Sequence, residues 1–100
     1  MQKLVLVSAG PPERRIVVET LPAVIGREVS ADIRADDSRV RGFHCVLDSE
    51  DETVFVLDLG TRNGTFVNGV RVGRAELRDG DTLTVGRITF VVHWEGGRER

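Results

Sequence analysis

The stretch GTRNGTFVNGV, residues 60–70, carries two Asn-Gly pairs five residues apart. Asn-Gly within alternating apolar residues is the strongest short-range signal for a β-hairpin, because both residues tolerate a positive φ. Asn68-Gly69 fits this pattern, so we expect a tight hairpin over residues 66–72. Asn63-Gly64 follows DLGTR instead of an alternating strand. The loop there holds more hydrogen-bonding side chains than a turn needs, which favours a recognition loop over the simpler alternative of a polar surface loop.

Outward from this hairpin, the sequence consists of short strands divided by turn residues. Valine and threonine, which favour strands, are abundant, and no window has the apolar period of a helix. We therefore predict an all-β, two-layer β-sandwich with no helix longer than one turn. The candidate strands cover residues 3–8, 14–20, 23–28, 43–48 and 53–59, with two more in 79–94 broken at Gly86-Arg87 and at most one in 31–42.

Two of these strands have diagnostic apolar patterns. Every second residue from Ile88 to Trp94 is large and apolar, so one face of the last strand is expected to be buried. In residues 53–59 both alternating sets contain apolar residues. That pattern fits a strand lying between two layers.

The composition argues against several classes of protein. One cysteine permits no internal disulfide, and no apolar run reaches the roughly 20 residues of a membrane span. The N-terminal residues lack the pattern of a cleavable leader. A net charge of −2 gives no general attraction to nucleic acid. We therefore expect a cytoplasmic monomer that binds neither nucleic acid nor membrane.

Metal, cofactor and catalytic chemistry have few candidate residues. His44 and Cys45 are adjacent, but neighbouring strand residues point to opposite faces, and no second cysteine or spaced histidine pair could complete a tetrahedral site. Cys45 is expected to be a small buried apolar residue. The two histidines and the serines offer no nucleophile with an obvious base. We expect a binding protein without metal or cofactor, and not an enzyme.

Five short motifs carry a specific signature when they are taken in order. They are IGR (25–27), RGFH (41–44), DLGTRNGT (58–65), VNG (67–69) and LRDGDTLTVG (77–86). Together they resemble the forkhead-associated (FHA) domains, over about residues 3–94. The resemblance implies a sandwich of about ten to eleven short, mainly antiparallel strands, with paired first and last strands and with loops at one end that bind phosphothreonine peptides. We accordingly expect an FHA-like domain over residues 1–94 and a flexible tail, or the start of a linker, over 95–100.

The resemblance also implies roles for individual residues. Arg27 matches an arginine that contacts phosphate, for which a guanidinium supplies a planar fork of donors. Asn63 matches an asparagine that bonds the peptide main chain, and His44 matches a histidine that braces the loops without touching the ligand. Gly64 is expected to allow a close backbone approach. The expected phosphopeptide site is Arg27, Arg41, Gly42, Thr61, Arg62 and Asn63, supported by Gly26, His44, Gly64, Thr65 and Asn68.

One position departs from the family pattern. Three residues before the histidine the family usually has a serine whose hydroxyl binds phosphate, whereas this chain has Arg41. The arginine could replace that contact with a longer donor, fill the pocket, or pair with Asp36 or Asp37 and weaken the site. The resemblance implies a phosphothreonine-recognition module in signalling downstream of serine/threonine kinases, with a kinase or its substrate as partner. The alternative, which Arg41 supports, is an interaction module of the same fold that does not depend on phosphate.

This assignment carries a geometric expectation. Arg27, Arg41, Arg62 and Asn63 should converge on adjacent loops at one end of the sandwich. The acidic stretch DSEDE (48–52) should lie away from them, because its charges would repel a phosphate dianion.

Overall fold

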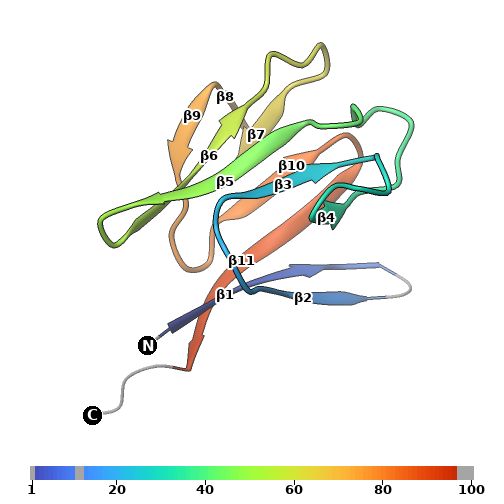
Figure 1. Cartoon of the computed structure of the whole chain (residues 1–100). Coiled ribbons are helices and arrows are strands. Elements are labelled where there is room, and N and C mark those ends of the chain that lie inside the picture. The colour runs from blue at the N-terminus through green and yellow to red at the C-terminus, as the bar shows by residue number, and fades with distance from the viewer. Residues whose placement is uncertain (1, 11–12, 97–100) are drawn as a thin grey trace.

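The computed structural model describes residues 2–10 and 13–96, which form two β-sheets and contain no helix (Figure 1). The first sheet has six strands in the order β2 (Arg14–Val18), β1 (Gln2–Ser8), β11 (Ile88–Gly96), β10 (Thr82–Val85), β7 (Thr65–Val67) and β8 (Val70–Val72). The second has five, in the order β4 (Ile33–Arg34), β3 (Ala23–Gly26), β5 (Cys45–Glu50), β6 (Thr53–Asp58) and β9 (Arg74–Glu76). All pairings are antiparallel except that of β3 with β4. The predicted all-β, two-layer sandwich is confirmed.

The core lies between the two sheets and follows the alternation of each strand. In β11, Phe90 and Val92 are fully buried, while Ile88 and Trp94 pack against the same cluster, so the predicted buried face is confirmed. Burying one such large side chain contributes roughly 1.5–3 kcal/mol. The facing sheet supplies its own inward residues, namely Ile25, Cys45, Leu47, Val54 and Val56.

Strand β6 differs from its prediction. It belongs to one sheet and is not enclosed between layers: Val54 and Val56 are buried, whereas Phe55 and Leu57 are only partly buried. The guanidinium carbon of Arg74, from β9, lies 4.0 Å from the centroid of the Phe55 ring. This cation–π contact covers an apolar residue on the outer face, which explains the apolar pattern on both sides of the strand.

The predicted tight hairpin at Asn68-Gly69 is confirmed. Val67 pairs with Val70, and both turn residues have a positive φ, 51° at Asn68 and 81° at Gly69. Positive φ at both central positions is the signature of a type I′ turn, whose twist matches that of the flanking strands.

The first and last strands pair, as expected, with Gln2 opposite Gly96. β11 therefore continues two residues beyond the expected domain end at residue 94, and the rest of the expected tail, residues 97–100, lies outside the described residues. The tip of the β5–β6 hairpin lies at one end of the sandwich. The loops that follow β3, β4 and β6 lie at the other end (Figure 1).

Candidate functional site

Three loops meet at the end of the sandwich away from the β5–β6 tip. The amide of Arg27, just after β3, donates to the carbonyl of Arg41 at 2.8 Å. The Asn63 side chain, between β6 and β7, donates from Nδ2 to the carbonyl of Arg39 at 2.9 Å. Loop residues far apart in sequence are thus tied together, by one bond between main chains and one from a side chain to a main chain. The expected convergence of Arg27, Arg41, Arg62 and Asn63 on adjacent loops is confirmed, and their binding of a ligand stays a prediction.

Gly26 is required by the closeness of two of these segments. A Cβ atom at this position would lie 1.9 Å from the carbonyl oxygen of Gly42. The contact places the end of β3 directly against the loop that carries Arg41, and it leaves no room for any side chain. Gly26 supports the site by this approach, while Gly42 provides the opposing main chain.

His44 joins the Arg41 loop to the Asn63 loop and is fully buried. Its Nδ1 accepts a hydrogen bond from the Arg41 amide at 3.1 Å, and its Nε2 donates to the Gly64 carbonyl at 2.8 Å. A ring that accepts at Nδ1 and donates at Nε2 is the neutral tautomer protonated on Nε2. Its burial prevents contact with a ligand, which fits the bracing role that the resemblance implies.

Asp58 organises the recognition loop and was absent from the expected site. Its Oδ2 accepts from the amides of Gly60 (3.0 Å) and Thr61 (2.9 Å), and its Oδ1 accepts from the hydroxyls of Thr61 and Thr65, both at 2.7 Å. Partial burial opposes ionisation, but these bonds outweigh it and lower the pKa of Asp58 below its ordinary value. An aspartate shortly before Gly-Thr is a signal for such an Asx-type turn.

The hydroxyl of Thr61 is turned toward the inside of the recognition loop. Thr61 was expected to contact the ligand, but its side chain is buried. Its hydroxyl donates to Asp58 and accepts from the Gly64 amide at 3.0 Å, so the group is already used inside the loop. Thr61 therefore braces the loop, as the fully buried Thr65 does through the same carboxylate.

Arg71, on β8, is a second residue that the sequence reasoning missed. Its Nη2 donates to the carbonyls of Thr61 and Arg62, each at 3.1 Å. A Cβ at Gly64, which has a φ of +86°, would lie 2.7 Å from the Arg71 Nε. The close approach that was expected at Gly64 is made by the Arg71 side chain of the same protein.

Asn68 does not support the ligand loops. It lies at the far end of β7, where its Nδ2 donates to Asp81 Oδ1 and its Oδ1 accepts from the Thr82 amide, both at 3.0 Å. The side chain holds the β7–β8 turn against the start of β10. The VNG motif therefore indicates the fold, and Asn68 does not give the ligand loops the support that was expected of it.

The side chains of the loops form a shallow, positively charged pocket of about 520 Å³. Three guanidiniums and one carboxylate give it a formal charge of +2. Its lining residues are Arg27, Glu28, Val29, Arg34, Val40, Arg41 and Gly42. The acidic residues 48–52 lie on the hairpin at the opposite end, as expected (Figure 1).

The ion pairs around this pocket are loose. Arg27 Nε lies 3.9 Å from Asp36 Oδ1, and the two side chains are 51% and 67% exposed. Exposed pairs of this kind contribute about 0–1 kcal/mol, so Arg27 is not locked in place. Arg41 makes no ion pair within the part of the chain that the structure describes. Its expected alternative pairing with Asp36 or Asp37 is not found.

Cys45 is fully buried, and this burial raises the pKa of its thiol to about 12. It therefore stays a neutral, apolar-like residue, as expected. Across residues 2–10 and 13–96, no three His, Cys, Asp or Glu side chains lie close enough to share a metal ion. The same residues include no helix that could cross a membrane.

Known proteins match this chain in sequence and in fold. A family model described as FHA domain matches residues 23–86. The glycogen accumulation regulator GarA of Mycobacterium tuberculosis is 33% identical over 89 residues, which is 88% of this chain and 55% of GarA. The ABC transporter ATP-binding/permease protein Rv1747 of the same organism is 39% identical over 67 residues, covering 67% of this chain and 8% of the transporter. The chain spans about half the length of the first curated relatives it matches.

Solved structures agree in fold over nearly the whole chain. An FHA domain from a structural and functional analysis of phosphothreonine-dependent FHA domain interactions superimposes with a TM-score of 0.86 at 26% identity, covering 94% of this chain and 98% of its own. The FHA domain of FhaA, complexed with the intracellular domain of Rv3910, gives a TM-score of 0.83 at 27% identity, covering 90% and 99%. Because the FHA family model spans residues 23–86 and a relative is 33% identical over 88% of the chain, the chain belongs to the FHA domain family.

Proposed function

We propose that this domain binds protein segments that carry phosphothreonine, through Arg27, Arg41 and the Asn63 loop. The observation that carries the proposal is the pocket that Arg27 and Arg41 both line, beside the convergent loops. A phosphate dianion needs several fixed donors, and charge-assisted hydrogen bonds from guanidinium are among the strongest available.

The roles divide between ligand contacts and bracing groups. Arg27 and Arg41 hold the phosphate oxygens, with Arg62 on the adjoining loop. Asn63 uses one amide hydrogen on Arg39, so its second amide hydrogen and its Oδ1 are left for the peptide main chain. Because His44, Thr61 and Asp58 already fix the loops, little ordering entropy is lost on binding.

The matched FHA domains support this proposal. One was studied for phosphothreonine-dependent interactions, and FhaA is complexed with the intracellular domain of another protein. We extend this to a partner that is itself a protein phosphorylated on threonine, either a serine/threonine kinase or its substrate. The domain acts as a cytoplasmic interaction module and has no catalytic role of its own.

Calorimetric titration tests the proposal directly. The ligands are a peptide library fixed at phosphothreonine and the same library with unmodified threonine. We expect heat of binding only with the phosphorylated library, and its loss in Arg27→Ala. Equal binding of both libraries would refute the proposal and favour the alternative of a phosphate-independent interaction module.

A further inference from the structure

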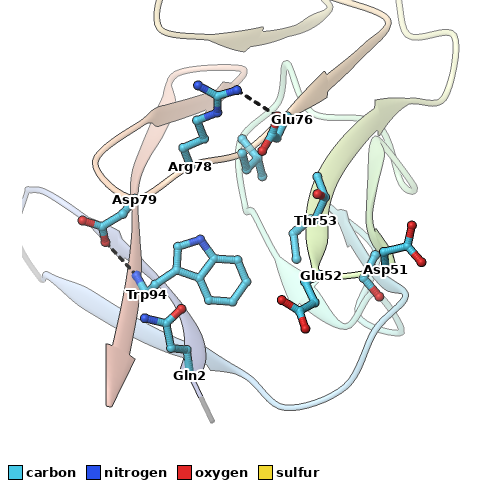
Figure 2. Close-up of a pocket in the computed structure, with 11 residues that line it drawn as sticks. Gln2, Asp51, Glu52, Thr53, Glu76, Arg78, Asp79 and Trp94 are labelled. Carbon is cyan, nitrogen blue, oxygen red and sulfur yellow. Dashed lines mark hydrogen bonds and ion pairs between the residues drawn. The ribbon is translucent and has the colours of Figure 1, made fainter. Parts of the chain in front are cut away.

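A larger groove lies at the opposite end of the sandwich, and the proposed phosphopeptide site makes no use of it (Figure 2). Its volume is about 930 Å³, and it lies between the β5–β6 tip, the β9–β10 connection and the paired ends of β1 and β11. Val54 and Leu77 form an apolar floor and are almost completely buried. The Leu77 amide donates to the Val54 carbonyl at 2.8 Å, which fixes this floor.

The wall of the groove is Trp94, the one tryptophan of the chain. Figure 2 shows its indole pointing into the groove, on the side that faces Glu52 and Thr53. Its main-chain amide donates to Asp79 Oδ1 at 2.8 Å, so the residue is held in position. No hydrogen bond among residues 2–10 and 13–96 uses the indole N–H, and no buried side-chain polar atom there lacks a partner. The indole N–H is therefore reached by solvent, and tryptophans of this kind are typical anchors of protein interfaces.

Carboxylates surround this apolar surface. The lining acids are Asp51, Glu52, Glu76 and Asp79, against the single base Arg78, which gives the groove a formal charge of −3. Arg78 Nη2 lies 3.1 Å from Glu76 Oε1 and so neutralises that side. Asp51 and Glu52 have no ion-pair partner within the described part of the chain. The groove thus combines a half-buried indole, whose N–H is reached by solvent, with uncompensated negative charge.

We propose that this groove is a second docking site, and that its occupant is an arginine-bearing segment of a partner protein. A guanidinium stacks on an indole face through its cationic π-system, and its fork of donors matches a carboxylate such as Asp51 or Glu52. The groove and the arginine pocket lie at opposite ends, so they take different segments and are occupied independently.

NMR of the full chain tests the proposal, because a single tryptophan gives a single indole N–H signal. The probe is the blocked peptide Gly-Arg-Leu-Arg-Gly, with Gly-Gln-Leu-Gln-Gly as its matched control, each titrated to millimolar concentration. We expect the arginine peptide to move the Trp94 indole signal with an affinity that falls as salt is added. The glutamine peptide should leave the signal in place, and Arg27→Ala should leave the response unchanged.

Charge variants show whether the groove itself is responsible. The double variant Asp51→Asn, Glu52→Gln should weaken the peptide by about tenfold, given about two- to fivefold for each exposed charge. Asparagine tolerates the positive φ of 59° at residue 51, so this variant is expected to fold. The matched control Glu13→Gln, Glu19→Gln removes two exposed acids elsewhere and should change nothing.

Three results would overturn the proposal. The first is an indole signal that ignores the arginine peptide or responds equally to the glutamine peptide. The second is an affinity that the Asp51→Asn, Glu52→Gln variant leaves unchanged. The third is an indole signal that moves in Arg98→Gln, Arg100→Gln without any peptide, because the occupant would then be the chain's own C-terminal arginines and not a partner.

Discussion

Replacing Arg41 tests whether its guanidinium takes over the phosphate contact that the family usually makes with a serine hydroxyl. The backbone of Arg41 is held on both sides: its carbonyl accepts from Arg27, and its amide donates to His44. The side chain is exposed and makes none of the internal ion pairs seen in the described residues. Arg41→Ala and Arg41→Ser therefore remove a side chain without disturbing the loops, so any change in affinity reports on the ligand contact.

The expected loss of affinity follows from the single phosphate contact that each Arg41 substitution removes. One charge-assisted hydrogen bond contributes roughly 1.5–3 kcal/mol, so Arg41→Ala should weaken phosphothreonine binding by about 10- to 150-fold. Arg41→Ser should cost less, because a serine at this position supplies the hydroxyl that the family normally uses. Arg27 starts beside Asp36 at 3.9 Å and must give up that loose pair on binding. Asp36→Asn should accordingly strengthen binding, by up to about fivefold.

Calorimetric titrations of the parent and these variants with one phosphothreonine peptide provide the measurement, with Arg15→Ala as a control for lost charge at a remote exposed site. If Arg41 instead fills the pocket, Arg41→Ser should tighten binding and Arg27→Ala should have no effect on the parent. Affinity unchanged by both Arg41 substitutions would refute both readings and leave Arg41 as a solvated loop residue.

Three further predictions concern the bracing groups. Asp58 has a lowered pKa in the folded state, so the ionised carboxylate stabilises the fold above about pH 4, and this contribution is lost as pH falls through the folded pKa. Asp58→Asn should cost about 2 kcal/mol of unfolding free energy near neutral pH. In urea unfolding at several pH values, the variant should also lose less stability at acid pH than the parent does. Gly26→Ala should cost about 3 kcal/mol or prevent folding, whereas Gly73→Ala, where a Cβ meets nothing within 4 Å, should be nearly neutral by the same denaturation assay. Arg71→Ala should weaken the phosphopeptide about three- to tenfold by releasing two loop carbonyls, with Arg15→Ala unchanged, and an unaltered affinity would show that the loop holds its shape without that clamp.

The strands were largely predictable because apolar alternation and turn residues are local signals. Ile88 to Trp94 and the Asn68-Gly69 hairpin needed no tertiary information. The missed strand β9 has three residues, which is too short to show a period, and it forms by pairing with β6. The outer face of β6 was misread because a distant arginine, Arg74, covers Phe55.

The site was predictable only in part, for a related reason. The loops of Arg27 and Asn63 followed from the motifs, but which hydroxyl faces outward depends on where Asp58 points. Its carboxylate turns inward and uses the Thr61 hydroxyl, and no pattern in the sequence specifies that direction. Arg71 lies in an ordinary alternating strand, and its reach back to the recognition loop is visible only in three dimensions.

The two ends of the molecule carry opposite charge even though the whole chain is only mildly acidic. The arginine pocket has a formal charge of +2 and the Trp94 groove one of −3, and they lie at opposite ends of the sandwich. Such a separation orients a dianionic peptide toward the arginine loops during encounter, because the repulsive acids lie on the far side. Since His44, Asp58 and Thr61 hold those loops before the ligand arrives, electrostatic steering acts mainly on the association rate, while the arginine contacts set the dissociation rate. Added salt should therefore slow association more than it speeds dissociation.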